Sequence, residues 1–230
     1  MITLSIVLGG LHFGLLFAGL RGVDAGPAAV AIQLSIPFSS LLALFIYGER
    51  LRPAQVAGLA IAFAGVYVMG GEPASQVSVP HLIMVVGGAL AWAVANIVIK
   101  RLGPLDPMVI NAWFGALTAP QMLLASLILE RGQLAAITGA DRFGWAAVVY
   151  TAVAASIVAY GLWYRLIRAH PVNRVVPPTL LAPVLAMGFA AWLLDEPLTA
   201  RTVGGGLLTL AGVAMVQFMG RRATATRSPP

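Results

Sequence analysis

The chain carries eight apolar stretches, and its charged residues fall between them or at their ends. A helix of about 20 residues is long enough to cross the roughly 30 Å hydrocarbon core of a bilayer. A transmembrane barrel would instead show strands of alternating apolar and polar residues, whereas residues 86–99, VGGALAWAVANIVI, are apolar all round. The pattern predicts an all-α polytopic membrane protein. Its eight transmembrane helices are expected at about residues 2–20, 27–47, 54–70, 80–99, 108–129, 143–164, 176–194 and 201–219.

The composition supports lipid as the surroundings of this chain. Hydrophobic residues make up 60% of it and charged residues 10%, the reverse of what a soluble surface requires. The net charge of +6 could suggest nucleic acid, but the basic residues stand singly or in pairs at helix ends rather than along one face. We therefore expect a lipid bilayer and no nucleic acid as partner. The chain has no cysteine, which excludes a disulfide and a thiolate metal site.

The distribution of basic residues predicts the orientation. If the basic tail at residues 221–230 is cytoplasmic, eight crossings place the N-terminus on the same side, and ten basic residues then face the cytoplasm against four outside. This obeys the positive-inside rule. The first 20 residues lack the basic region of a signal peptide, which indicates a membrane helix. Short loops and the absence of a transit peptide favour a bacterial inner membrane. The four outer residues are Arg21, Arg131, Arg142 and Arg201.

Two segments of the chain resemble each other at a spacing of 147 residues. The segment YGERLRPAQVAG begins at Tyr47, and LDEPLTARTVGG begins at Leu194. One ungapped register covers about fifty residues and spans five predicted helices. Because five is odd, the two copies must cross the membrane in opposite directions, which makes them an inverted repeat. The register pairs Gly14 with Gly161, Arg21 with Arg168, Glu49 with Glu196, Gly58 with Gly205 and Gly65 with Gly212.

The two copies differ in length. We expect an incomplete first copy of three helices over residues 1–72, a complete second copy of five helices over residues 80–220, and a basic cytoplasmic tail over 221–230. Counterparts of the first two helices of the second copy would lie before Met1. Two interpretations remain: a ten-helix protein started at an internal methionine, or a shortened paralogue with an exposed groove.

Two related segments resemble a known family. PFSSLLALFIYGERLRPAQVAGLAIAFAGVYV, from Pro37, and PVLAMGFAAWLLDEPLTARTVGGGLLTLAGVAMV, from Pro183, are similar to the paired signature of the drug/metabolite transporter superfamily, EamA type. The resemblance covers nearly the whole chain. It implies a fold derived from ten helices in two inverted repeats of five, with a central cavity for small metabolites, amino acids or drugs. The chain departs from this pattern by lacking the first two helices, and by placing Pro37 12 residues before Glu49 but Pro183 13 before Glu196.

Three residues within the predicted helices are candidates for the cavity. Pro37 and Pro183 interrupt the same helix of each half, and paired interruptions are the best sequence indication of a transporter's central site. Ordinary helix packing is the alternative. His12 is the only ionisable side chain placed near a bilayer midplane, where it could titrate or simply form a neutral hydrogen bond between helices.

Polar and aromatic residues extend this set. Gln33, Asn96, Asn111 and Gln121 carry amides that could bind a polar solute or join helices across the bundle. Trp92 lies one helical turn from Asn96 on the same face. Tyr160 lies one turn inside an aromatic belt and could contact solute or headgroups. The predicted cavity comprises His12, Gln33, Pro37, Trp92, Asn96, Tyr160 and Pro183.

Glu49 and Glu196 lie at opposite faces of the membrane in this topology, which argues against a proton-coupling pair. A carboxylate at such a hinge can accept hydrogen bonds at the N-terminus of the next helix, so we expect a structural role for both. Gly58 and Gly65 lie seven residues apart on one face of their helix, as do Gly205 and Gly212. Small residues at these positions allow close approach of two helix backbones.

The residues favour transport over catalysis. The chain has no intramembrane carboxylate pair, no paired-histidine metal motif, no nucleophile elbow and no phosphate-binding loop, so we expect no enzyme and no cofactor. The predicted function is secondary transport or export of small organic solutes by alternating access. The alternatives are a truncated or structural membrane protein that keeps the fold without a pathway and, less favoured, a membrane enzyme. A homodimer is left open.

Overall fold

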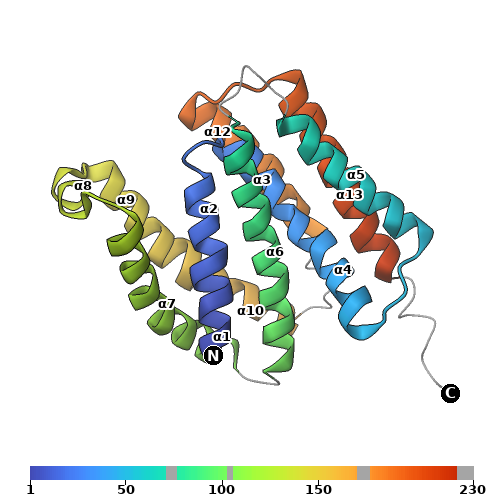
Figure 1. Ribbon diagram of the computed structural model, residues 1–230, viewed down its shortest axis with the longest axis horizontal. Coiled ribbons are helices and arrows are strands. Elements are labelled where there is room, and N and C mark those ends of the chain that lie inside the picture. Colours follow the sequence, from blue (N-terminus) through green and yellow to red (C-terminus); the bar gives the residue numbers. More distant parts are fainter. Residues whose placement is uncertain (71–76, 103–105, 170–176, 222–230) are drawn as a thin grey trace.

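A computed structural model describes residues 1–70, 77–102, 106–169 and 177–221. Every regular element in these ranges is helical, as the sequence predicts (Figure 1). The first two predicted spans are each built from consecutive segments. Residues 2–19 comprise α1 (Ile2–Leu4), η1 (Ser5–Phe13) and α2 (Gly14–Gly19), and residues 25–47 comprise α3 (Ala25–Ala31), η2 (Ile32–Leu34) and α4 (Ser35–Tyr47).

The remaining predicted spans also coincide with helices. They are α5 (Pro53–Gly70), α6 (Val79–Arg101), α7 (Pro107–Leu129), α9–η3–α10 (Arg142–Tyr150, Thr151–Val158, Ala159–Ala169), η4–α12 (Pro177–Leu180, Leu181–Leu194) and α13 (Ala200–Arg221). One short helix, α8 (Gln133–Gly139), lies between two predicted spans and was not predicted. Five helices in the described ranges are long and apolar enough to cross a membrane: residues 2–19, 25–47, 53–70, 79–101 and 108–129.

Both halves of the chain contain a π-helical segment at related positions. Residues 5–13 form one and residues 151–158 the other, and a shift of 147 residues carries 151–158 onto 4–11. A π-helix places more residues in each turn than an α-helix; it is rare, and where it occurs it is frequently at a functional site. In both halves this segment lies in the middle of a long apolar helix, so the same local distortion recurs.

Short 3₁₀ segments precede the two prolines singled out in the sequence. Residues 32–34 form the segment before Pro37, and residues 177–180 form the segment before Pro183. Proline has no N–H for the carbonyl four residues earlier, and its ring crowds that carbonyl. The tightened turns lie where this missing bond would fall, which explains why each helix changes its winding there.

The repeated hinge has the same backbone conformation in both copies. Gly48, at the end of α4, has φ of 66°, and Asp195, at the end of α12, has φ of 54°; both are left-handed. The next N–H donates back over six residues in each case, from Glu49 to Ala43 O and from Glu196 to Ala190 O, both at 3.4 Å. The two charged hinges therefore have the same helix-ending turn.

The buried core lies among α3, α5, α6 and α13. Helices α5 and α13, which are related by the repeat, pack tightly and antiparallel, since Gly58 meets Gly212 and Gly65 meets Gly205. A Cβ built on Gly58 would lie 2.9 Å from the carbonyl oxygen of Gly212, so only glycine allows this approach. Halfway between the glycine contacts, Thr209 Oγ1 donates to Gly205 O at 2.9 Å and to Ala62 O at 3.4 Å.

Helices α7, α8 and α9 form an arm beside this core (Figure 1). None of their described residues is buried, and α7 contacts the core through η1. This contact between η1 and α7 positions the site described next.

Candidate solute-binding site

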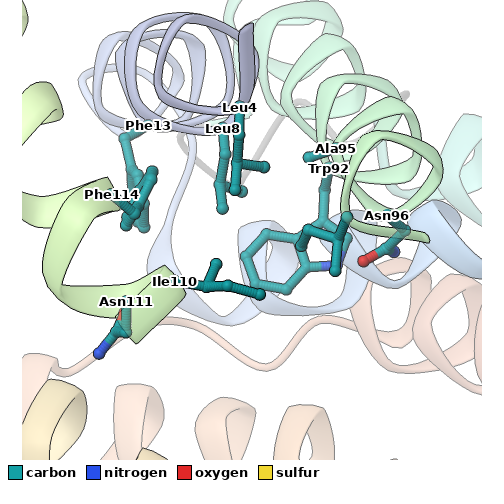
Figure 2. A pocket seen from close by; sticks show the side chains of 10 residues that line it. Leu4, Leu8, Phe13, Trp92, Ala95, Asn96, Ile110, Asn111 and Phe114 are labelled. Atoms are coloured by element: carbon teal, nitrogen blue, oxygen red, sulfur yellow. The ribbon is translucent and has the colours of Figure 1, made fainter. Parts of the chain in front are cut away.

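A cavity of about 110 Å³ lies among η1, α6 and α7 (Figure 2). Its walls come from residues 4–13 of the first span, residues 92–99 of α6 and residues 110–114 of α7, toward the side that the predicted topology places in the cytoplasm. Three aromatic side chains, Phe13, Trp92 and Phe114, dominate it. Asn96 lies beside Trp92, and Asn111 lies at the edge. The other lining residues are Leu4, Leu8, Ala95, Ile99 and Ile110.

The lining residues include no charged side chain. Taking a bare ion out of water into such a setting costs several kcal/mol or more unless a counter-charge meets it. The asparagine amides offer both donors and acceptors at the cavity. Asn96 lines the cavity and is also exposed. The arrangement therefore suits a solute with an apolar part and a polar group that carries no net charge.

His12 packs against two of the aromatic residues that line the cavity. The residue is 2% exposed, and its Nδ1 donates a hydrogen bond to the carbonyl oxygen of Gly88 at 2.9 Å. A carbonyl only accepts, so Nδ1 carries the proton in this bond. The ring also makes edge contacts with Trp92 and Phe13, at centroid distances of 4.8 and 4.7 Å. His12 therefore joins the first helix to α6 and supports two of the cavity walls.

A polar seam holds η1 against α7. Gln121 Nε2 donates to Ser5 Oγ at 2.8 Å, and Ser5, which is fully buried, donates to Ile2 O at 2.8 Å. One helix turn away, a Cβ built on Gly9 would overlap Thr118, so this glycine permits the close contact. The third wall of the cavity depends on this seam, because α7 contributes Phe114 and Asn111.

The structure brings together three of the seven predicted cavity residues. Trp92 and Asn96 line the cavity, and His12 contacts Trp92. Pro37 and Pro183 are buried, and Gln33 is partly buried, but none of the three lines this cavity. The backbone of Tyr160 is helical, and its side chain lies outside the described part of the chain. The central site predicted around the two prolines therefore stays a prediction.

One of the two acidic hinge residues, Glu196, caps a different helix from the one predicted. Two hydrogen bonds of Glu196 go to α3, earlier in the chain, rather than to the following helix, α13, at which the sequence predicted them. Its carboxylate accepts hydrogen bonds from the backbone N–H of Ala25, at 2.6 Å, and of Gly26, at 2.9 Å, and so caps α3. A carboxylate is favourable at either helix N-terminus, and the fold brings that of α3 within reach. Glu49 is exposed in the matching hinge.

Several cavity residues carried no signal that sequence reasoning could use. Phe13, Phe114 and Ile110 are apolar residues in apolar helices, indistinguishable from lipid-facing ones. Asn111 stood among the candidate amides but was not assigned to the cavity. Within the described ranges, no group of three His, Asp or Glu residues is placed to hold a metal ion.

Comparisons with known proteins agree with this architecture. Two "probable amino-acid metabolite efflux pumps", of Salmonella typhimurium and Escherichia coli, are 30% and 31% identical; each comparison covers 90% of this chain and 72% of the relative. An uncharacterized transporter of Bacillus subtilis is 24% identical, over 94% of this chain and 75% of its own. A solved crystal structure, 23% identical, has the same fold with a TM-score of 0.60 and covers 95% of this chain and 77% of that one.

The family comparison covers more than the signature segments. The model of the EamA-like transporter family matches residues 1–71 and 80–218, on either side of the segment that links α5 to α6. Members are membrane transporters rather than enzymes. The chain belongs to the EamA-like transporter family.

Proposed function

We propose that the protein is a secondary transporter that moves small organic solutes, amino-acid metabolites among them, across a bacterial inner membrane by alternating access. The family supports transport, and the printed names of two relatives supply the solute class. Both termini face the cytoplasm in this proposal, and all eight apolar helical segments cross the membrane.

The observation that carries the proposal is an uncharged cavity enclosed by apolar helices. It lies near the end of the bundle where Lys100 and Arg101 close α6, the end that the positive-inside rule assigns to the cytoplasm. A solute could enter there from the cytoplasm, which supports export as the direction of net transport.

The repeated backbone features support alternating access. In an inverted repeat, exchange of conformation between the halves turns an inward-open state into an outward-open one. The π segments, the 3₁₀ turns and the left-handed hinges recur at related positions, so each half carries the same deformable points. The tight antiparallel pair of α5 and α13 lies where a pseudo-two-fold axis would pass between the copies.

The test is solute uptake into proteoliposomes that contain the purified chain. A panel of radiolabelled amino acids and related metabolites is compared with protein-free liposomes, with and without a pH gradient. We expect saturable uptake of at least one solute. Uptake no faster than in protein-free liposomes, across the panel and in both insertion orientations, would contradict the proposal.

A further inference from the structure

The cavity among η1, α6 and α7 is small, about 110 Å³, and three aromatic side chains line it. We propose that it binds small zwitterionic or neutral solutes that carry a single ring, with the ring between Phe13, Trp92 and Phe114 and the polar end at Asn96. This inference rests on the proposed transport function and names the solute class of the same site.

The size of the cavity limits what can enter. An apolar cavity of about 150 Å³ holds one benzene molecule, so about 110 Å³ holds a single ring at most. A fused polycyclic drug is too large for this space. The part of the solute that enters must therefore be comparable to one amino-acid side chain.

The order of residues along α6 places a polar amide beside the aromatic wall of the cavity. On α6, Asn96, Trp92 and Gly88 follow one another at intervals of four residues and so share one helix face. Asn96 is exposed, Trp92 lines the cavity, and Gly88 accepts the hydrogen bond of buried His12. A ring packed against Trp92 therefore has the Asn96 amide one helical turn away on the same face of α6.

The walls favour a planar ring over a flexible apolar chain. Three aromatic side chains line the cavity, and offset or edge contacts between rings add to the energy of burial. His12 holds Trp92 through an edge contact at 4.8 Å, so this wall is already placed before a solute binds. The Asn96 amide supplies a donor and an acceptor for the carboxylate and ammonium groups of a zwitterion.

Equilibrium dialysis of the purified full chain in detergent tests this inference. The probes are radiolabelled phenylalanine, cyclohexylalanine and alanine. We expect phenylalanine to bind at least about tenfold more tightly than alanine, with cyclohexylalanine between them. Trp92→Ala should bring the three affinities within about threefold, and Trp92→Phe should restore part of the preference.

Trp113 provides the matched control. It lies on α7, is 56% exposed and does not line the cavity, so Trp113→Ala should leave all three affinities unchanged. Circular dichroism and thermal unfolding show whether Trp92→Ala is folded. If it is not, the three affinities of wild-type protein are compared with those of Trp92→Phe instead. Equal binding of phenylalanine and alanine by wild-type protein would overturn the inference.

Binding and flux separate the two proposals. Ring-selective binding without uptake in proteoliposomes would overturn the transport function and support the site. Uptake with no preference for ring-bearing solutes would support transport and overturn the assignment of this site.

Discussion

The carboxylate of Glu196 accepts a hydrogen bond from the backbone N–H of Gly26, 170 residues earlier in the chain. A second bond, from Ala25 N–H, completes the cap of α3. The hinge of one half thus holds the start of a helix in the other half.

Loss of this cap should destabilise the fold. Glu196→Ala removes two charge-assisted hydrogen bonds and leaves the N–H groups of Ala25 and Gly26 without their partner, which we expect to cost about 1–3 kcal/mol. Glu196→Gln keeps an acceptor but loses the charge, so it should lie between wild type and Glu196→Ala. Thermal unfolding in detergent measures the order, and equal stability of Glu196→Ala and wild type would contradict the capping role.

Packing of α5 against α13 should discriminate sharply between two adjacent glycines. A Cβ on Gly205 would lie 2.6 Å from the backbone oxygen of Gly65, whereas a Cβ on Gly204 would meet nothing within 4 Å. Gly205→Ala should therefore cost about 1–3 kcal/mol through overpacking. Gly204→Ala should be neutral or slightly stabilising, because alanine favours the helix. The comparison needs only the two unfolding temperatures, and the account fails if the two variants behave alike.

The role of His12 predicts a linked effect on stability and binding. His12→Leu keeps apolar bulk but loses the donor to Gly88 O, which should cost about 0.5–1.5 kcal/mol and loosen Trp92. His12→Asn keeps a donor and should retain more of both properties. Unfolding temperature and phenylalanine affinity should fall together in His12→Leu. A fall in stability with unchanged affinity would show that Trp92 does not depend on His12.

The surroundings of Glu130, beyond the end of α7, lead us to expect that folding stability depends on pH. The hydrogen bond from Ser126 Oγ, at 2.6 Å, and then the nearby Arg21 guanidinium hold the pKa of Glu130 below its ordinary value of 4.5. Because the folded pKa is the lower one, this stabilisation is present above pH 4.5 and is lost as the pH falls through the folded pKa. The effect should be small, since both charged side chains are exposed.

Glu130→Gln isolates this contribution. The unfolding temperature of wild type should exceed that of the variant at neutral pH, and the difference should shrink as the solution is acidified below the folded pKa. A difference that stays constant with pH would show that Glu130 does not contribute through its charge.

The sequence predicted the helices well because membrane helices are specified by length and apolarity, two properties that can be read locally. Pro37 and Pro183 likewise indicated where the winding would change. The partner of Glu196 could not be predicted, because the N-terminus of α3 is brought to it only by the fold. Phe13 and Phe114 could not be assigned either, since an apolar residue may face lipid or a cavity equally well, and the π segment changes which residues share a face.

Counterflow in proteoliposomes tests the central claim most directly. Liposomes are loaded with an unlabelled solute that the chain takes up, and a trace of the same labelled solute is added outside. A single site exposed alternately to each side predicts transient accumulation of label above its outside concentration, which is absent from protein-free liposomes and from those carrying an unrelated membrane protein. Label that only equilibrates would contradict alternating access.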